Sequence, residues 1–485
     1  MRKSLARRGN SVFSAVNGPS ARKRGALRLA TATAVTGLLA AGAIAGAGTS
    51  FADTPDQQGQ GGATATIQGL EPGSFADAII TNGRETEKVS AGLFRMNVDG
   101  GGTLRTYCID IHNPTQREAK YRETPWSGTS LATNKDAGKI RWILENSYPQ
   151  KNDLGQLAKD AGVSGKLNNA EAAAATQVAI WRYSDGAQVK AKNKDAEKLA
   201  EWLYDSAKVV EEPKASLTLD NASVAGKAGQ KLGPVTVHTN ADKVTVTASE
   251  ELKAAKFQVV DEGGKAVTSA VNNSKLYFNV PAGTQPGAGS LRLSATTQVP
   301  VGRAFASDSK SQTQILAGSS DSTVNAEAKV SWAKQGAIPA VTVKKDCAKG
   351  GVDITVTNKG DEAFPVTVGG KTVATVPAGG SKTVLFPVAE DEKYDFTIAG
   401  QHFSGTLDCK TAGTPSTPPS SKPSPASAGG SSTGTNGSNG TTGGTNLAET
   451  GSSSSTPMIA GAAVVLVLLG GGAVFFLRKK KTAGH

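Results

Sequence analysis

Cysteine and histidine are scarce in this chain. Its 485 residues include three cysteines and four histidines, which form neither a Cys-x-x-Cys pair nor a His-Glu-x-x-His motif. Zinc sites are built mainly from clustered cysteine and histidine ligands, so the sequence predicts no metal site and no cofactor. A nucleophilic enzyme needs a base beside its nucleophile, and the shortage of histidine makes that class a weak alternative. We therefore expect a protein that is not an enzyme.

Acidic residues are missing from the start of the chain. No acid precedes Asp53, whereas residues 1–30 carry eight basic side chains. A run of small and apolar residues, about 29–48, follows and leads to the small-x-small sequence Ser50-Phe51-Ala52. This order predicts a signal peptide at 1–52 that is cleaved after Ala52. We therefore expect a secreted protein.

The basic excess of the chain lies at its two ends. The net charge is +12, but eight basic residues belong to the predicted signal peptide and four more stand at 478–481. Subtracting these twelve from 53 basic residues leaves 41, which equals the number of acidic residues. The segment 53–451 is therefore neutral overall, and its charge gives no argument for a nucleic-acid partner.

The C-terminal segment 447–485 combines three features. Leu447-Ala448-Glu449-Thr450-Gly451 comes first, the apolar run 458–477 is long enough to span a bilayer, and a basic tail follows. This arrangement resembles the sorting signal of Gram-positive surface proteins, in the LAxTG form of actinobacteria. The resemblance implies that a sortase, of class E, cleaves between Thr450 and Gly451 and joins Thr450 to peptidoglycan at the cell wall. A single-span membrane protein is the alternative.

Composition predicts a multidomain protein between these ends. Residues 63–212 hold the helical signals, at 169–184 with Asn169 as N-cap and at 194–209, together with strand-like stretches at 92–98 and 103–111. We expect an α+β domain here. Residues 411–446 are rich in Ser, Thr, Gly and Pro, and such a segment buries too little apolar surface to fold, so it predicts a disordered linker that spans the wall.

Two all-β modules are expected at 214–336 and 338–410. Short alternating runs separated by turn residues favour β-sandwiches of the Ig-like kind. The runs lie at 235–237, 244–247, 276–280 and 291–293 in the first module and at 341–343, 352–356, 366–368 and 383–386 in the second.

Cys347 and Cys409 lie near the two ends of the second β module. In an oxidising exterior a disulfide between them is the expected pairing, and it would stabilise the module by about 4 kcal/mol. The alternative joins Cys108 to one of them and leaves a different thiol free. With the first pairing, Cys108 is an odd cysteine in a secreted protein.

Gln177 is unusual for its place on the predicted helix. Its neighbours on the same face are all apolar: Ala173, Ala174, Ile180 and Trp181. Burying an amide without a partner costs several kcal/mol, so Gln177 needs either a backbone hydrogen bond or a chemical role. For Cys108, the ordinary interpretation is an inert buried thiol.

Together the two residues carry a resemblance to the thioester domains of Gram-positive surface adhesins. Tyr107-Cys108-Ile109-Asp110 matches the cysteine motif of these domains, and Thr176-Gln177-Val178-Ala179, followed by Ile180-Trp181, matches their TQxA motif. The resemblance covers 63–212. It implies an internal thioester between Cys108 Sγ and Gln177 Cδ, formed with loss of ammonia and supported by Tyr107, Asp110, Thr176 and Trp181.

The thioester implies a covalent adhesin. An amine on an unidentified protein or polymer would attack Gln177 Cδ, release the thiol of Cys108 and leave an amide bond. One alternative is a wall-anchored structural or non-covalently adhesive protein whose thioester is not used. A cysteine hydrolase is the other. On a strand, however, His112 would lie on the same face as Cys108 but four residues beyond it, which is poorly placed for proton transfer.

Overall fold

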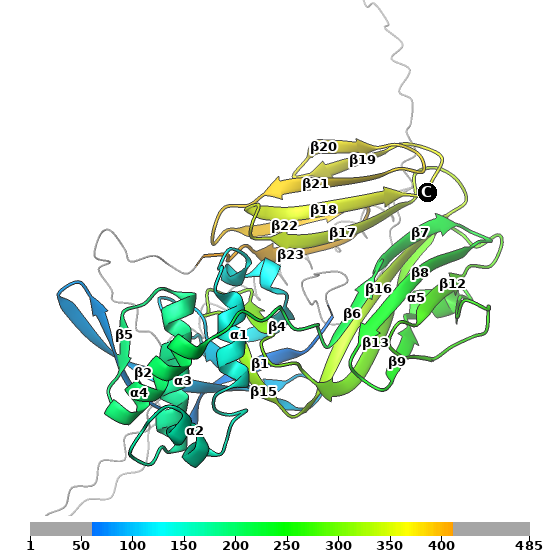
Figure 1. The fold of residues 1–485 in the computed structure, drawn as a ribbon. Coiled ribbons are helices and arrows are strands. Elements are labelled where there is room, and N and C mark those ends of the chain that lie inside the picture. The colour runs from blue at the N-terminus through cyan, green and yellow to red at the C-terminus, as the bar shows by residue number, and fades with distance from the viewer. Residues whose placement is uncertain (1–60, 411–485) are drawn as a thin grey trace, which may run out of the picture. The chain divides into compact units, whose positions relative to one another are not determined.

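The computed structural model describes residues 61–410 (Figure 1). The predicted signal cleavage at Ala52, the linker 411–446, and the sorting signal with Thr450, Gly451 and its apolar run all lie outside the described residues. Within residues 61–410, no helix combines the length and the apolar character needed to cross a membrane.

Seven antiparallel strands form the sheet of the first region: β1 (Thr64–Asn82), β2 (Glu85–Val98), β3 (Thr103–Cys108), β4 (Lys120–Thr124), β5 (Val189–Ala191), β14 (Ala304–Ser307) and β15 (Gln314–Ser319). Their order is β2-β3-β15-β14-β4-β1-β5. Because β1 also pairs with β2, six strands close into a ring, and β5 pairs with the later part of β1. Closure removes the unpaired edges that an open sheet would leave.

The β14–β15 hairpin belongs to this sheet although its residues lie in the range predicted as the second module, 214–336. β14 pairs with β4 and β15 pairs with β3, so the hairpin fills the space between two strands that are consecutive in the sequence. The predicted range 63–212 therefore omits two strands of its own sheet. Local periodicity identifies a strand but carries no information on which distant strand it pairs with.

Four α-helices accompany this sheet: α1 (Ala137–Glu145), α2 (Leu154–Asp160), α3 (Asn169–Ser184) and α4 (Lys194–Ser206). α3 has the predicted bounds and packs against β1, β2 and α4 (Figure 1). α4 ends three residues before its predicted end at residue 209, and α1 and α2 were not predicted. The N-cap of α3 is Asn168 rather than Asn169, because the Asn168 side chain accepts the N–H of Glu171, whose carboxylate accepts the N–H of Asn168.

The second region contains two sheets. One has the order β10-β12-β8-β6 and the other the order β11-β9-β13-β16-β7, in which β16 and β7 are parallel. Buried residues of both sheets belong to one hydrophobic core that continues into the first region. The elements are β6 (Leu217–Asp220), β7 (Ser223–Lys227), β8 (Lys231–Thr239), β9 (Val244–Ala248), α5 (Glu250–Ala254), β10 (Gln258–Val260), β11 (Ser269–Ala270), β12 (Lys275–Asn279), β13 (Gly287–Gln298) and β16 (Asp321–Ala333).

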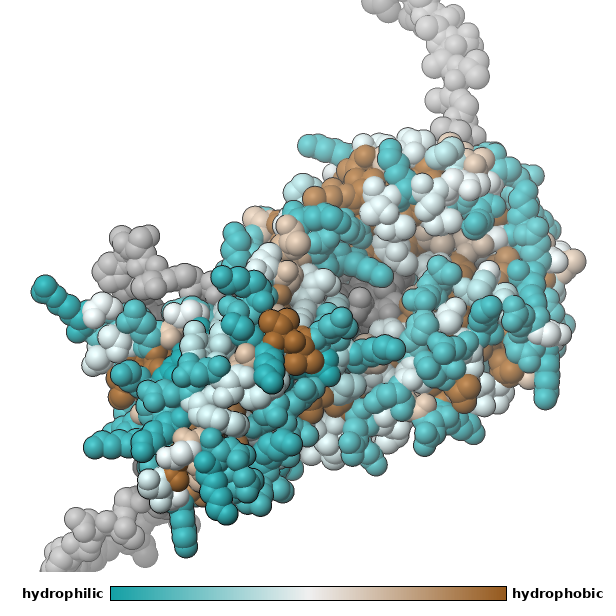
Figure 2. All heavy atoms as spheres, in the orientation of Figure 1, coloured by the Kyte–Doolittle hydropathy of each residue, from teal (hydrophilic) through white to brown (hydrophobic). Residues whose placement is uncertain are grey.

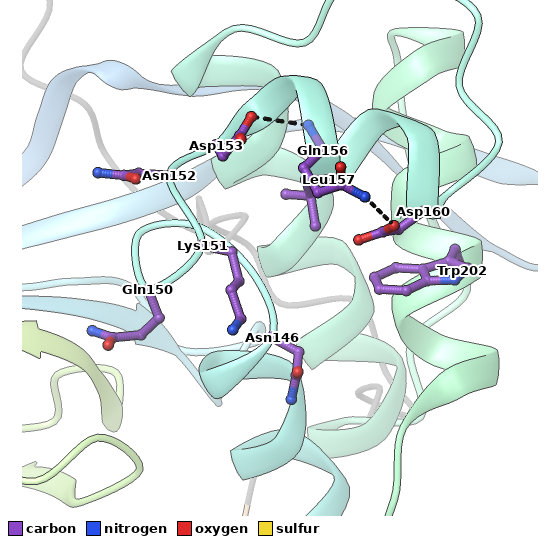
Figure 3. Close-up of a pocket in the computed structure, with 9 residues that line it drawn as sticks. All are labelled: Asn146, Gln150, Lys151, Asn152, Asp153, Gln156, Leu157, Asp160 and Trp202. Carbon is purple, nitrogen blue, oxygen red and sulfur yellow. Dashed lines mark hydrogen bonds between the residues drawn. The ribbon is translucent and has the colours of Figure 1, made fainter.

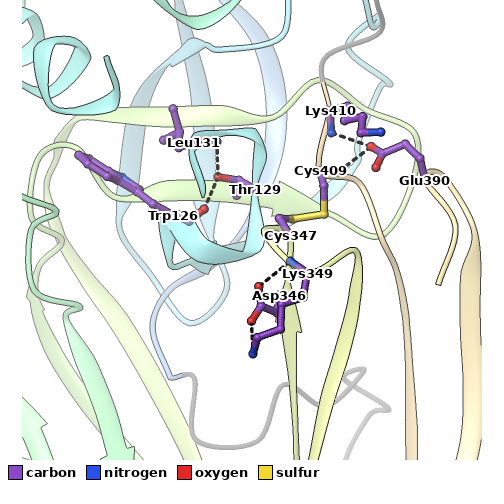
Figure 4. Close-up of a disulfide and its surroundings, with 9 residues drawn as sticks. All are labelled: Trp126, Thr129, Leu131, Asp346, Cys347, Lys349, Glu390, Cys409 and Lys410. Carbon is purple, nitrogen blue, oxygen red and sulfur yellow. Dashed lines mark hydrogen bonds and ion pairs between the residues drawn. A yellow bond between two sulfur atoms is a disulfide. The ribbon is translucent and has the colours of Figure 1, made fainter. Parts of the chain in front are cut away.

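The third region has a hydrophobic core of its own. Its strands are β17 (Pro339–Asp346), β18 (Gly351–Asn358), β19 (Phe364–Val368), β20 (Lys371–Val376), β21 (Ser381–Pro387), β22 (Lys393–Ile398) and β23 (Gln401–Thr406). A disulfide joins Cys347 to Cys409, which is the first of the two pairings considered from the sequence (Figure 4). The backbone N–H of Cys347 also donates to Ser127 O of the first region, at 3.0 Å.

Hydrophilic side chains cover most of the face seen in Figure 2, and hydrophobic ones form small groups among them. Four large hydrophobic residues are exposed in the described part of the chain: Val209, Val271, Val373 and Leu385. They lie in three different regions of the sequence, and scattered apolar residues of this kind are ordinary on a protein surface. The surface therefore does not by itself identify the functional site.

Candidate functional site

The fold brings Cys108 and Gln177 together. Cys108 is the last residue of β3, and Gln177 lies near the middle of α3, inside the unbroken buried stretch Ala172–Trp181. Both side chains have no measurable exposure. A strand end and a helix interior are rigid supports, and rigid supports are what a reaction between two protein side chains requires.

The carboxamide of Gln177 is paired with the backbone of Cys108. Nε2 donates to Cys108 O at 2.8 Å, and Cys108 N–H donates to Gln177 Oε1 at 2.9 Å. This pair of hydrogen bonds answers the question of how a buried amide is satisfied on an apolar helix face. It also fixes the carboxamide carbon beside Cys108, with its oxygen held by a backbone donor at the distance typical of an oxyanion-stabilising group.

The thiol of Cys108 is kept neutral by its surroundings. Sγ accepts the N–H of Asp110 and donates to Asp110 O, both at 3.1 Å. Burial raises the pKa of the Cys108 thiol well above its usual value, and the charges of Asp110 and Asp185 raise it further. Because the thiolate is the nucleophilic form, any reaction of this sulfur needs a group that accepts its proton.

Of the supporting residues expected from the sequence, two contact the main chain of the first region. Tyr107 donates through its hydroxyl to Tyr148 O at 2.7 Å, and the Thr176 hydroxyl donates to Ala172 O within α3 at 2.8 Å. Both side chains are buried and make ordinary structural hydrogen bonds. Their contacts hold β3 and α3 in place rather than act on the sulfur.

Trp181, unlike Tyr107 and Thr176, interacts with the thiol of Cys108. Its indole Nε1 is buried without a hydrogen-bond partner among the described residues. The indole nevertheless acts on Cys108, because it lowers the thiol pKa against the larger, raising effect of burial. A buried N–H that is left unpaired next to a sulfur is suited to stabilise a thiolate when one forms. Of the expected supporting residues, Trp181 and Asp110 are therefore the two that lie beside the thiol.

Sequence reasoning missed Asp185, which caps the C-terminus of α3. Its Oδ1 accepts the N–H of Ile111 at 3.1 Å, and its Oδ2 accepts the hydroxyl of Ser184 at 2.6 Å. Burial, followed by the charge of Asp110, raises the pKa of Asp185 to about 7. A signal was present, since Asp185 lies about two helical turns after Gln177 and ends the same helix.

Gln314 was also missed. On β15 it lies directly opposite Cys108 in the strand register, and its Oε1 accepts the hydroxyl of Thr106 at 2.9 Å. Its Nε2 is buried and has no hydrogen-bond partner in the described part of the chain. No sequence signal could have found Gln314, because it reaches the site through pairing of β15 with a strand about two hundred residues earlier.

The hydrogen bonds of the sulfur bear on the hydrolase alternative. Within residues 61–410 both hydrogen bonds of Cys108 Sγ go to the main chain of Asp110, and neither goes to His112. Burial lowers the pKa of His112, and the charge of Asp110 partly opposes this effect. The cysteine–histidine pair that this alternative requires is not formed here.

Other polar features lie elsewhere. A hollow of about 240 Å³ is lined by residues of α2 and of the segment between α1 and α2, together with Trp202 of α4, and it includes neither Cys108 nor Gln177 (Figure 3). Glu390, Asp391 and Asp408 bring three carboxylates together in the third region. One oxygen of Glu390 already accepts the backbone N–H groups of Cys409 and Lys410 (Figure 4), and we assign no metal to this cluster.

Solved structures that match this chain include three proteins of low sequence identity and low TM-score. The Bacillus anthracis TIE protein is 16% identical, with coverage of 71% of this chain and 80% of that chain and a TM-score of 0.25. The thioester domain of the Enterococcus faecium TIE86 protein is 16% identical, with coverage of 58% and 100% and a TM-score of 0.27. The CsuC–CsuE chaperone–tip adhesion subunit complex of Acinetobacter baumannii is 10% identical, with coverage of 39% and 98% and a TM-score of 0.13.

None of the curated proteins matches this chain. A family model does match part of it. Residues 105–209, which include both Cys108 and Gln177, match the model described as Thioester domain.

Proposed function

We propose that this protein attaches covalently to an amine-bearing partner through an internal thioester between Cys108 Sγ and Gln177 Cδ. The observation that carries the proposal is the pair of hydrogen bonds between the Gln177 carboxamide and the backbone of Cys108. The match of residues 105–209 to the thioester-domain family supports it, because that family implies attachment to amines through an internal thioester.

Formation of the bond follows from the site. Sγ attacks Cδ of Gln177, negative charge develops on Oε1, and the backbone N–H of Cys108 already donates to that oxygen. The C–N bond then breaks and the nitrogen leaves as ammonia. Amides are poor electrophiles, so the step depends on fixed positions and on stabilisation of the oxyanion rather than on intrinsic reactivity.

Attachment is the second acyl transfer at the same carbon. An uncharged amine of the partner attacks Cδ, the same backbone N–H stabilises the same oxygen, and the C–S bond breaks. The thiolate of Cys108 leaves beside the unpaired indole N–H of Trp181 and takes up a proton. The product is an amide bond between the partner and the side chain of Gln177.

The rest of the chain would display this site. We propose a secreted protein that is joined by a sortase to peptidoglycan through Thr450, with the second and third regions as Ig-like spacers and the linker 411–446 after them. The sequence motifs at 1–52 and 447–485 support this arrangement. The neutral segment between them gives no support to a nucleic-acid partner.

A second candidate is a wall-anchored structural or non-covalently adhesive protein with an unused thioester. The observation that favours it is the burial of the reactive pair, since neither Cys108 nor Gln177 is exposed. In the described arrangement no amine reaches Cδ from solvent. Covalent attachment then requires that the site open, whereas the alternative requires only that it stay closed.

Intact-mass measurement tests the proposal. The freshly purified protein should be lighter by one ammonia than its processed sequence with the Cys347–Cys409 disulfide formed, and treatment with methylamine should add one methylamine. Cys108 should react with an alkylating reagent only after that treatment. Gln177→Ala and Cys108→Ala should abolish both mass changes, whereas Gln188→Ala, at an exposed glutamine of the same region, should leave them intact.

Two outcomes would separate the candidates. A wild-type protein that keeps its ammonia and has an alkylatable Cys108 would end the thioester proposal. A protein that loses ammonia but takes up no methylamine would favour the second candidate. If the thioester does react, adducts that survive denaturation and are absent with Gln177→Ala would isolate the partner.

A further inference from the structure

Two carboxyl groups converge on the segment that follows Cys108. Asp110 is two residues beyond it and 2% exposed, and Asp185 binds the N–H of Ile111 in the same segment. Both charges raise the pKa of the Cys108 thiol, after the larger effect of burial. The two carboxyls are also coupled electrostatically, because the charge of Asp110 raises the pKa of Asp185.

One oxygen of Asp110 is unused. Oδ2 accepts the side-chain amide of Asn113 at 2.6 Å, whereas Oδ1 is buried without a hydrogen-bond partner among the described residues. The buried structural carboxylate of Glu123 is different, since it accepts donors from Ala63, Ser216 and Arg303 on both of its oxygens. Leaving a buried acceptor empty is unfavourable, so the free oxygen of Asp110 needs a reason.

We propose that Asp110 is the proton-transfer group of both acyl transfers and that Asp185, which accepts the N–H of the next residue, Ile111, adjusts when Asp110 holds its proton. The inference rests on the proposed thioester and assigns roles that the cysteine and glutamine motifs do not. Asp110 is suited to the direct role because its main chain binds the sulfur and one oxygen of its carboxylate has no hydrogen-bond partner among the described residues. Asp185 acts through Asp110 and is a positioning residue.

The proton balance closes in the formation step. The S–H bond of Cys108 breaks and its proton passes to the carboxylate of Asp110, while Sγ bonds to Cδ of Gln177. The C–N bond breaks and the same proton passes to the departing nitrogen, which leaves as ammonia. The carboxylate ends as it began, and no oxidant or reductant is involved.

Attachment uses the same group in the other direction. The incoming amine forms the C–N bond and gives up one proton to the carboxylate of Asp110. The C–S bond breaks, and the carboxyl returns the proton to the thiolate of Cys108. A carboxyl that serves as base and then as acid is the ordinary behaviour of a positioned general acid–base group.

The charged surroundings decide when the carboxyl pair holds its proton. Tyr121 of β4 has a raised pKa and stays neutral, and burial keeps the pKa of His112 low. Asp408 is a third acid whose titration is coupled to this pair. Burial, and then the charge of Asp110, raises the pKa of Asp408 to about 7. The surroundings are thus acidic rather than basic, and a carboxyl proton is retained close to neutral pH.

Ser184 gives Asp185 the means to change its protonation state. Its hydroxyl donates to Asp185 Oδ2 at 2.6 Å and also lies 3.1 Å from Ile180 O, where it can donate instead. When Asp185 is protonated, the hydroxyl turns to Ile180 O and accepts the new proton. The hydrogen-bond arrangement therefore accommodates both states without a change of backbone.

The test is the rate of each acyl transfer in the full chain, followed by intact mass. Asp110→Asn keeps the size of the side chain and an acceptor for Asn113 but cannot take a proton. We expect ammonia loss, and methylamine uptake per uncharged amine, to be slower by about 10²-fold or more. The exposed Asp205→Asn of α4 should react as the wild type does.

The pH profile separates proton transfer from simple structure. In the wild type the methylamine rate per uncharged amine should rise with pH as the carboxyl of Asp110 loses its proton. With Asp185→Asn the rise should move to lower pH, because Asp110 loses a negative neighbour. An unmoved profile would overturn the inference, and this variant decides the matter if Asp110→Asn fails to fold. Wild-type protein that never loses ammonia would instead overturn the proposed function, whereas a reactive wild type with unaffected Asp110→Asn would overturn the inference alone.

Discussion

The first and third regions differ in where the strands that complete their β structure come from. The third region, 338–410, has a separate core and a disulfide between residues of its own. The first region closes its ring only with β14 and β15, which come from far along the chain. The domain boundary that composition predicts therefore agrees with the start of a folding unit at the third region. The boundary predicted at the end of the first region instead separates two strands from the sheet to which they belong. Cys108 lies on β3, the strand with which β15 of this hairpin pairs.

The largest effect is expected from cutting the chain at the boundary that composition suggests. A fragment of residues 61–212 lacks β14 and β15, so β3 and β4 become open edges and Gln314 no longer pairs opposite Cys108. We expect this fragment not to fold cooperatively and not to lose ammonia. A fragment of residues 338–410 should fold by itself. Circular dichroism with thermal unfolding checks both, and a cooperatively folded 61–212 fragment would contradict the closure argument.

A buried ion pair gives the next largest effect. Arg303, just before β14, donates to Glu123 of β4 at 2.9 Å, and both side chains are almost fully buried. Arg303→Met leaves the Glu123 charge in the interior without its cation, and we expect a loss of about 3–5 kcal/mol in unfolding free energy. Urea denaturation measures it.

The third region offers the matched control. Lys349 pairs with Asp346 and Asp353 at the surface, with its side chain 54% exposed. Lys349→Met should change stability little, because solvent screens exposed pairs. Equal effects of the two substitutions would mean that the ion pair between Arg303 and Glu123 does not hold the β14–β15 hairpin in its sheet.

Local sequence patterns predicted much of the fold and the centre of the site. The helix 169–184 was predictable because its alanine-rich run and its polar N-terminal residues act within one element. Four strands of 338–410, namely β17, β18, β19 and β21, were predictable because each alternates in place, whereas β20, β22 and β23 were not predicted. Cys108 and Gln177 were identifiable because each lies in a local motif and their anomalies coincide.

The rest depends on contacts between distant residues. Gln314 reaches Cys108 through strand pairing, and Asp185 reaches Ile111 across the turn that follows α3. Neither contact produces a periodic pattern in the amino-acid sequence. The helix α2 was missed because its seven residues are too short to establish a pattern.

Removal of the disulfide should act on the third region alone. Cys347 and Cys409 are separated by 62 residues, and bridging such a loop restricts the unfolded chain. We expect Cys347→Ser with Cys409→Ser to lower the unfolding free energy of this region by about 2–4 kcal/mol. Hydrogen exchange, resolved by region, measures the change. Equal loss of protection around β3 would show that the two regions unfold together.

The smallest expected effect is the pH dependence of stability, which one buried carboxyl in each of two regions should control. The pKa values of Asp185 in the first region and Asp408 in the third are raised to about 7, chiefly by burial, from a usual value of 3.8. A carboxyl whose folded pKa is raised binds its proton more tightly when folded, so its stabilising contribution is complete below about pH 4 and is lost as the pH rises through about 7. Asp185→Asn should flatten this loss in the first region and Asp408→Asn in the third, each by about 1 kcal/mol between pH 6 and 7. Exchange protection of each region at the two pH values measures the effect, and a loss that both variants retain in full would assign it to other groups.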